Sequence, residues 1–369
     1  MSAPDFVVAG SPIWLGPLDQ TLLPWIETHR TAYSALFLLA DAKAVPAGQA
    51  ALQALAQRES NLHPCRLDLS PSPTYQPGDA EASKTLAVCE RVWKAMVDAQ
   101  LDRRALVLVL GGGVLGDLGG FCAATYKRGI DFVQIPTTLL AMTDAALGGK
   151  VGINFHDIKN VLGAFRQPAA VFADPAFLNT LHPRELRSGL AEVVKHAYIG
   201  SPELLQELQE NHHLLKAPEE ASAETWNRLL RRSIAVKARI VSEDPLEGGL
   251  RALLNFGHTF GHGLESYFLS IGKPITHGEA IAMGMLCELD DPTPADVALL
   301  RLLLPPAPLA QAPWLRVWER MQHDKKNEHR QIIAATPGDA PFALRKTALS
   351  PQEAQRRWQR CLRLLGELQ

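Results

Sequence analysis

The segment at residues 105–110, ALVLVL, constrains the fold of this chain more than any other. It is an unbroken aliphatic run, which is typical of a parallel strand buried on both faces of its sheet. Three glycines at 111–113 follow it directly, and an apolar helix-like segment covers 114–125. Neighbouring segments continue the pattern, with strand-like runs at 35–41 and 131–136 and a helical period at 85–100. This alternation predicts a parallel sheet with helices on both faces.

From about residue 175 the hydrophobic period becomes that of helices. Five successive segments carry it: 183–197, 202–215, 221–243, 249–269 and 278–288. Prolines are dense between residues 290 and 313, so helices there should be short and interrupted. We therefore expect an α/β, Rossmann-like N-terminal domain with a parallel sheet over residues 1–174, and an all-α C-terminal domain over residues 175–369.

The composition argues against a protein that binds nucleic acid or membranes through its net charge. The 369 residues are 47% hydrophobic and 21% charged, with a net charge of −2, which gives no general attraction to nucleic acid or membrane. No apolar run approaches the ~20 residues that a membrane span needs. Five scattered cysteines without CxxC spacing, and a first segment unlike a signal peptide, predict a cytoplasmic protein with reduced thiols.

Residues 250–279 concentrate candidate metal ligands. His258 and His262 are four residues apart and would share one face of a helix, and His277 follows beyond an irregular stretch. Imidazole is a typical zinc ligand, so the layout suits a divalent metal held by one helix and the next segment. The alternative is three unrelated histidines, one capping a helix and two hydrogen-bonded in a core. Spacing alone leaves both interpretations open.

Two glycine-containing segments suit a phosphorylated ligand. The strand–glycine–helix junction at 106–121 would present free backbone N–H groups to phosphate, with Asp117 available to a cofactor hydroxyl. Within 137–160, Lys150 follows two glycines, and Asp144 lies in an apolar run where a charge needs a partner, a metal or a ligand. The alternatives are a tight turn without a ligand, and a surface loop with solvated lysines and a capping aspartate.

Two further groups supply charge. Glu192 and Lys195 are three residues apart on a predicted helix; a surface ion pair is the simpler interpretation, and a glutamate metal ligand beside a substrate-binding lysine is the alternative. Upstream of the histidines lie Lys237, Glu247 and Arg251. Arginine suits a planar carboxylate, whereas an exposed, salt-bridged helix would also account for these residues.

Taken together, the motifs make the chain resemble the 3-dehydroquinate synthase family of sugar-phosphate cyclases. Between residues 77 and 330 they are, in order, PGDAEASK, LGGGVLGDLGGF, ATYKRG, QIPTTLLAMTD, GGKVGIN, KNVLGAF, GLAEVVKHA, EGGLRALLNFGHTFGH, HGEAIAMGM and DKKN. Each motif is weak alone, but their order and separations are specific to the family.

The resemblance implies a role for each matching residue. The ligands of a Zn²⁺ or Co²⁺ ion would be Glu192, His258 and His277. Phosphate contacts would come from Lys150, Asn160, His262, Lys325 and, from the other subunit of a homodimer, Arg128. The substrate carboxylate would be held by Lys237 and Arg251, and its hydroxyls by Asp144, Lys195, Glu247 and Asn255. NAD contacts would involve Asp41, Glu81, Lys84, Gly112, Gly113, Asp117, Thr137 and Thr138, and Lys159 would touch both cofactor and substrate.

The resemblance also implies the reaction. A phosphate lyase of the shikimate pathway, which leads to chorismate and the aromatic amino acids, would convert 3-deoxy-D-arabino-heptulosonate 7-phosphate to 3-dehydroquinate. Transient oxidation by NAD, β-elimination of phosphate, reduction and intramolecular aldol closure would follow one another. The alternatives are a cyclase for another sugar phosphate such as sedoheptulose 7-phosphate, an NAD-dependent alcohol dehydrogenase of the same fold, and a degenerate homologue with a binding role. Cyclases for substrates without a carboxylate would lack the Lys237 and Arg251 pair.

Overall fold

The computed structural model describes residues 2–70, 75–78, 80–156, 158–305, 309–322 and 331–368, and the chain forms two compact units. Unit 1 comprises Met1–Tyr75, Asp79–His182 and Ala223–Leu230. Unit 2 comprises Gln76–Gly78, Pro183–Ser222 and Arg231–Gln369. Among the described residues, no helix has both the length and the apolar content needed to cross a bilayer.

Unit 1 is built on a seven-stranded sheet with the order β1-β2-β9-β6-β5-β3-β4. The strands are β1 (Phe6–Val8), β2 (Ser11–Leu15), β3 (Leu36–Asp41), β4 (Leu62–Leu67), β5 (Leu106–Gly111), β6 (Asp131–Pro136) and β9 (Ala170–Ala173). Every neighbouring pair is parallel except β1 and β2. The predicted parallel sheet is confirmed, and the aliphatic run at its centre is buried along its whole length.

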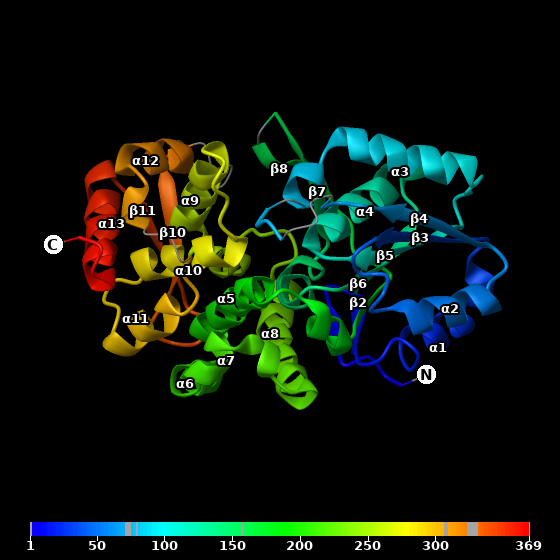
Figure 1. The fold of residues 1–369 in the computed structure, drawn as a ribbon, viewed down its shortest axis with the longest axis horizontal. Helices are drawn as coiled ribbons and strands as arrows, with labels where there is room; N and C mark the ends of the chain where they lie inside the picture. Colours follow the sequence, from blue (N-terminus) through cyan, green and yellow to red (C-terminus); the bar gives the residue numbers. More distant parts are fainter. Residues whose placement is uncertain are drawn as a thin grey trace. The chain divides into compact units, whose positions relative to one another are not determined.

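Helices cover both faces of this sheet, with α3 (Leu86–Asp98) and α4 (Gly113–Thr125) on one side and α1 (Leu22–His29) and α2 (Gln49–Arg58) on the other (Figure 1). Alternate strand residues point to each face. The side that faces α3 and α4 is formed by Phe37, Leu39, Val107 and Val109. At Gly120 of α4 a Cβ atom would lie 2.4 Å from the Val151 side chain, so only glycine permits this approach.

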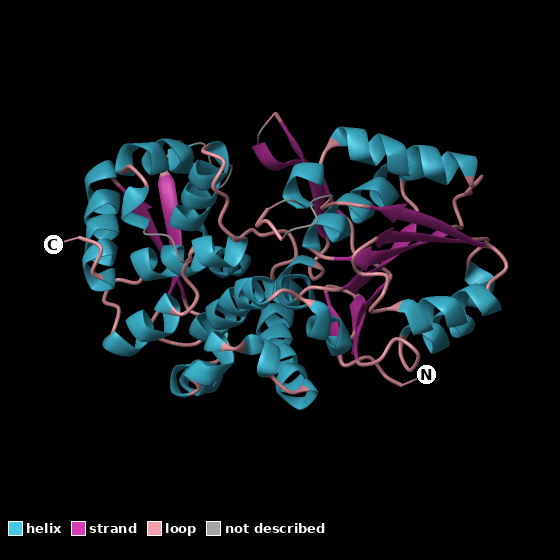
Figure 2. Ribbon diagram, in the orientation of Figure 1, coloured by secondary structure: helices cyan, strands magenta, loops and turns pink. Residues whose placement is uncertain are grey.

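A separate hairpin extends unit 1, formed by β7 (Lys150–Phe155) and β8 (Ile158–Phe165). Figure 2 shows it as the short pair of strands beside the main sheet. The alternative interpretation, a surface loop, is wrong for this part of the chain, because the strands pair in antiparallel register from Lys150 opposite Phe165.

Unit 2 is mainly helical, as predicted (Figure 2). Its helices are α5 (Pro183–Gly200), α6 (Pro202–Glu210), α7 (His212–Lys216), most of α8 (Ala223–Glu243), α9 (His258–Ser270), α10 (His277–Glu288), α11 (Pro294–Arg301), α12 (Trp314–Gln322) and α13 (Pro351–Leu365). It also contains an antiparallel hairpin that the sequence pattern did not predict, β10 (Ile332–Pro337) with β11 (Leu344–Leu349). The polar side chains of β11 hide its strand period, since four of its six residues are at least partly exposed and polar or small.

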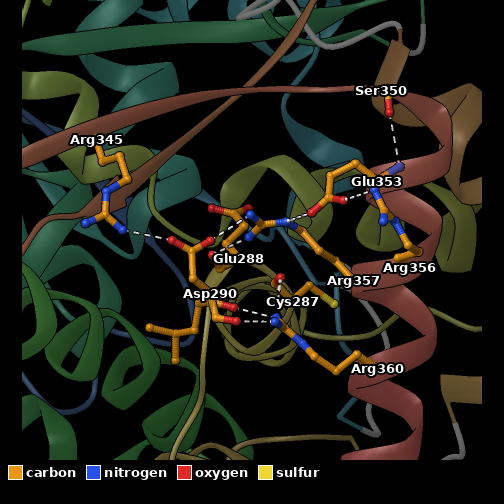
Figure 3. A network of polar contacts seen from close by, with 10 residues as sticks. Cys287, Glu288, Asp290, Arg345, Ser350, Glu353, Arg356, Arg357 and Arg360 are labelled. Atoms are coloured by element: carbon orange, nitrogen blue, oxygen red, sulfur yellow. Dashed lines mark hydrogen bonds and ion pairs between the residues drawn. The ribbon is translucent and has the colours of Figure 1, made fainter.

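Arginines of α13 bind the carboxyl end of α10, where helix carbonyls lack partners within the helix (Figure 3). Arg357 donates to the Glu288 carbonyl at 2.9 Å, to the Asp290 carboxylate at 2.7 Å and to Glu353 at 3.0 Å. Arg360 donates to the carbonyls of Cys287, Leu289 and Asp290. Two cations at a helix C-terminus also complement its dipole. The C-terminal helix therefore holds the end of α10 in place.

The stability that this network contributes depends on pH through Asp290. Partial burial raises the pKa of Asp290, but Arg357 and Arg345 outweigh that effect and hold the pKa below its usual value. A carboxyl group with a lowered native pKa stabilises the fold above its unfolded pKa, about 4, and loses that contribution as the pH falls through the native value.

We expect Asp290→Asn to lower the free energy of unfolding at pH 7 by about 0.5–1 kcal/mol, a modest figure because solvent screens a half-exposed carboxylate. The difference from the unsubstituted protein should shrink below about pH 4, where native Asp290 itself takes up a proton. Urea unfolding at pH 7 and pH 3 measures both values. Asp291→Asn removes the adjacent exposed carboxylate and is the matched control. An equal loss at both pH values would contradict the ion-pair account.

Candidate active site

Three potential ligand atoms converge inside unit 2. Glu192 comes from the middle of α5, His258 is the first residue of α9, and His277 is the first residue of α10. The Glu192 Oε1 atom lies 3.8 Å from His258 Nε2 and 3.5 Å from His277 Nε2, and all three ligand atoms fall within 4.8 Å of one another. Tetrahedral zinc places its ligands about 3.3 Å apart, from metal–ligand bonds of about 2.0–2.1 Å. The donor set therefore fits a divalent metal with an open position.

Glu192 is wholly buried and forms an ion pair with Lys195, one turn along α5. Lys195 is also buried and donates to the Leu254 carbonyl at 2.9 Å. The simpler expectation of a surface pair is wrong, because neither side chain reaches solvent. Two charges in such surroundings carry a desolvation cost of several kcal/mol each, which only close partners offset. Cationic and imidazole groups around Glu192 supply that compensation.

His277 lies between two carboxylates. Its Nε2 faces Glu192, and its Nδ1 is 3.5 Å from Glu265 Oε2. Burial lowers the pKa of His277, but Glu265 and Glu192 outweigh it and raise the pKa to about 9. The surroundings thus favour positive charge at this point. Carboxylates often contact the second ring nitrogen of metal-binding histidines, and Glu265, to which the motif alone assigned no role, contacts His277 in this way.

His262 lies one turn after His258 on α9, on the same side of the helix. Its ring centroid is 5.1 Å from that of His258 and 6.1 Å from that of His277. Ligand atoms of His262, Glu265 and His277 form a second group within 4.8 Å. The four-residue spacing noted in the sequence therefore brings a histidine next to the ligand group, as expected for an α-helix.

Glycines let α10 approach the two other ligand helices. At Gly278 a Cβ atom would lie 2.2 Å from the Ser188 carbonyl oxygen of α5. At Gly284 a Cβ atom would lie 1.7 Å from the Gly257 carbonyl oxygen, directly before α9. Glu192, His258 and His277 can meet because the backbones at these two positions come closer than any side chain allows.

An arginine–glutamate ion pair also joins α5 to α10. Arg184 of α5 binds Glu279 of α10 through two parallel bonds of 2.6 and 2.7 Å. Glu279 also completes a capping box with Thr276 at the start of α10. Neither Arg184 nor Glu279 was assigned a role from the sequence, although the HGE motif contains the glutamate and its capping-box spacing from Thr276 was visible.

A tight loop after α8 shapes a second cluster in unit 2. The Asp244 carboxylate accepts backbone N–H bonds from Gly248, Gly249 and Arg251 at 2.7–3.0 Å. Glu247 sits in this loop in the left-handed region, with φ 65°, and accepts a bond of 3.1 Å from the Asn255 amide. Of the predicted substrate contacts, Glu247 and Asn255 are thus brought together. The two predicted carboxylate-binding residues are both buried, Lys237 and Arg251.

Five of the predicted cofactor residues lie at the carboxyl edge of the unit 1 sheet. Strand order reverses between β3 and β5, and such a switch point is where open parallel sheets bind ligands. Asp41 ends β3, and Gly112 caps the start of α4 directly after β5. A Cβ atom on Gly112 would lie 3.0 Å from the Thr138 side chain, which follows β6. Gly113 and Thr137 complete this edge.

A buried lysine organises a polar cluster beside that edge. Lys84 donates to Asp117 at 2.5 Å and to the Asn160 side chain. Burial raises the pKa of Asp117, an effect that Lys84 opposes. Asn154 links the cluster further, because it donates to Glu81 at 2.7 Å and accepts from the Asn160 backbone at 2.9 Å. Asn154 closes the GGKVGIN motif but was not assigned a role from the sequence.

The remaining predicted residues are distributed over unit 1. Lys150 is exposed at the start of β7, and Lys159 is half-buried in β8. Asp144 is half-buried in a short π-helical turn at Ala141–Ala145. Arg128 is exposed and left-handed, with φ 70°. Lys325 lies outside the described residues.

Comparison with known proteins identifies the family of the chain. Residues 74–188 match the family described as 3-dehydroquinate synthase N-terminal, and residues 189–327 match 3-dehydroquinate synthase C-terminal. The chain belongs to the 3-dehydroquinate synthase family. A 3-dehydroquinate synthase from Listeria monocytogenes serovar 1/2a is 43% identical over 288 residues, which cover 74% of this chain and 77% of that relative.

Solved structures extend the likeness to the whole fold. The 2-epi-5-epi-valiolone synthase from Streptomyces hygroscopicus subsp. jinggangensis 5008, with NAD⁺ and Zn²⁺ bound, has a TM-score of 0.80 and 27% identity over 99% of both chains. A 2-deoxy-scyllo-inosose synthase complexed with carbaglucose-6-phosphate, NAD⁺ and Co²⁺ has a TM-score of 0.78 and 23% identity, over 96% of this chain and 98% of that one. The second likeness concerns the fold alone.

Proposed function

We propose that this protein is an enzyme that converts 3-deoxy-D-arabino-heptulosonate 7-phosphate to 3-dehydroquinate and phosphate. Family membership over residues 74–327 gives the reaction class, that of a carbon–oxygen lyase in the shikimate pathway. The observation that favours this substrate is the burial of two cations, Lys237 and Arg251, in unit 2. Lysine and arginine side chains are the usual partners of a carboxylate, and one that is held in place by burial can bind it in a defined orientation.

Glu192, His258 and His277 would hold a divalent ion, Zn²⁺ or Co²⁺. Their donor atoms, spacing and burial support this assignment. When bound, the ion polarises substrate oxygens as a Lewis acid, and NAD supplies a reversible hydride acceptor. Lys195 would stay charged beside Glu192 and orient a substrate hydroxyl from its fixed place on the Leu254 carbonyl.

The cofactor would bind at the carboxyl edge of the unit 1 sheet. Its pyrophosphate suits the free N–H groups at the start of α4, where Gly112 and Gly113 leave the backbone open. The other proposed contacts are Asp41, Glu81, Lys84, Asp117, Thr137, Thr138 and Lys159. We retain the division into an NAD-binding domain over 1–174 and a metal- and substrate-binding domain over 175–369 as part of this proposal.

The departing phosphate would be bound by cationic and polar groups that stabilise its charge. We assign this role to Lys150, Asn160, His262, Lys325 and Arg128. Hydroxyl groups of the substrate would contact Asp144, Lys195, Glu247 and Asn255, of which Glu247 and Asn255 are already joined by a hydrogen bond. The protein thus contributes mainly orientation and charge.

We also propose a homodimer, which two features of unit 1 support. Five large apolar side chains are exposed on the β7–β8 hairpin: Phe155, Ile158, Val161, Leu162 and Phe165, with exposed fractions of 37–56%. A concentration of this kind is typical of an interaction surface, and a second copy of the chain is the partner that we propose. Arg128 is itself exposed, as required of a residue that serves the partner's phosphate site. We further propose a cytoplasmic location, in keeping with the five free cysteines.

The function is tested with purified protein, NAD⁺, Zn²⁺ and the seven-carbon keto-acid phosphate. We expect stoichiometric release of phosphate and formation of the carbocycle without net accumulation of NADH, because the hydride is returned within one turnover. Phosphate release only from sedoheptulose 7-phosphate would indicate a different cyclase. Steady NADH production from a simple alcohol would indicate a dehydrogenase, and inactivity with every substrate would indicate a degenerate homologue.

Two histidine variants test the division of roles on α9. His258→Ala should lose bound zinc and activity together, since it removes one of three proposed ligands. His262→Ala should keep the metal and lose turnover by about 10²-fold or more, as expected when a charge-stabilising group is removed. Metal content after dialysis and phosphate release measure the two effects. Retention of zinc by His258→Ala, or its loss from His262→Ala, would reverse the assignment.

The hairpin variant Ile158→Ser/Phe165→Ser tests the dimer. We expect its dimer dissociation constant to rise at least about ten-fold, because apolar residues at the centre of an interface carry most of the binding energy. Sedimentation velocity across a concentration series measures the constant. Leu315→Ser removes an equally large, exposed side chain from α12 and should leave the constant unchanged. A monomeric unsubstituted protein would refute the assignment.

A further inference from the structure

The helix that begins at His258 has no side-chain cap of its own. Its N-cap residue is Gly257, which has φ 80° and no side chain to accept the free N–H groups of the first turn. A larger residue is excluded there, because a Cβ atom would lie 2.7 Å from the Ile281 carbonyl oxygen of α10. The close contact that brings α9 to α10 therefore leaves the start of α9 dependent on an acceptor from elsewhere in the fold.

Glu288, the last residue of α10, supplies that acceptor. Its Oε2 accepts from the Gly257 N–H at 2.7 Å, and its Oε1 accepts from the N–H groups of Thr259 at 2.9 Å and Phe260 at 3.3 Å. The side chain has no solvent exposure. A carboxylate in such surroundings is costly unless it is fully hydrogen-bonded, and the positive end of the α9 dipole adds to the compensation.

These bonds bracket His258. The residues on either side of it, Gly257 and Thr259, both donate to Glu288, so the carboxylate fixes the backbone from which the imidazole projects. The ring is then oriented locally, because its Nδ1 lies 3.1 Å from the Phe256 carbonyl oxygen. That contact places the hydrogen on Nδ1 and leaves Nε2, the atom that faces Glu192, as the donor to a metal.

Glu288 is itself held from the far side of α10. Arg357 of α13 donates to its backbone carbonyl at 2.9 Å, and Figure 3 shows the two residues side by side within the arginine network. The C-terminal helix, the end of α10 and the start of α9 are thus connected in series. The backbone and the side chain of Glu288 are both held by hydrogen bonds. Its carboxylate can therefore keep the residues that it binds in a defined position.

We propose that Glu288 is a positioning residue that holds His258 in the geometry required for metal binding. The proposal rests on the metal-binding role assigned above to His258, and Glu288 itself does not touch the metal or the substrate. Its effect should therefore appear in the affinity and spectrum of the bound ion, and not only in the stability of the fold.

The test uses the full-length protein freed of metal and titrated with Co²⁺. Glu288→Gln keeps the shape of the side chain but turns one acceptor into a donor that faces backbone N–H groups. We expect its dissociation constant for Co²⁺ to rise about 10- to 100-fold, the range typical when an outer-shell partner of a metal ligand is removed. We also expect the visible absorption of bound Co²⁺ to change in intensity, since the ligand geometry is altered.

Asp174→Asn is the matched control. Asp174 also accepts two backbone N–H bonds, from Ala176 at 2.9 Å and Leu18 at 3.2 Å, at the start of a helical turn that bears no proposed ligand. Both variants should unfold at lower urea concentrations, but only Glu288→Gln should weaken Co²⁺ binding. If Glu288→Gln fails to fold, Glu288→Asp, which keeps the charge but withdraws it by one methylene, gives the same comparison.

The outcomes separate the two proposals. Unchanged Co²⁺ affinity and spectrum in a folded Glu288 variant would leave it a purely structural cap and overturn the positioning role. Equal weakening in Asp174→Asn would overturn it as well, because the effect would then follow stability alone. Failure of the unsubstituted protein to bind Co²⁺ would instead overturn the metal-site assignment, and the positioning role with it.

Discussion

A carboxylate buried without solvent contact, that of Glu192, is the constraint on which the helical unit depends. An isolated charge in such surroundings would be neutralised or expelled, so the fold must bring compensating groups to it. Lys195 does so from the same helix, and His258 and His277 do so from the first residues of two others. The positions of α5, α9 and α10 are therefore linked by one electrostatic requirement. A divalent ion, when bound, adds positive charge at the same point.

Close backbone contact is what makes that convergence possible. Gly278 and Gly284 allow α10 to approach α5 and the start of α9 at distances that any side chain would prevent. The same closeness removes the usual solution to helix capping, because Gly257 has no side chain to offer. Glu288 then caps α9 from the neighbouring helix, and arginines of α13 hold the end of α10. The close packing of α9 and α10 thus accounts for the way α9 is capped and for the positions of His258 and His277.

Unit 1 also surrounds a buried charge with fixed partners. Its glycines after β5 lie at the switch point of a parallel sheet, where α4 begins without a side-chain cap. A buried lysine, Lys84, then joins Asp117 and Asn160 beside that edge, and Asn154 connects them to Glu81. Both units therefore place a buried charge among fixed partners, in one case beside the sheet edge and in the other among helices. Fixed dipoles and charges of this kind need little reorganisation when a substrate binds.

The sequence by itself determined the fold class, the family and the spacing of the histidines, because these depend on local period and on motif order. The run at 105–110, followed by three glycines, is typical of a buried strand, and residues four apart share one face of a helix. Tertiary structure alone decided that Glu192 and Lys195 are buried and not a surface pair, since residues far along the chain cover them. It also decided which atoms the carboxylates of Glu265, Asp244 and Glu288 contact. Each of these carboxylates contacts atoms that folding brings near it. The sequence does not indicate which backbone group or ring a carboxylate will contact.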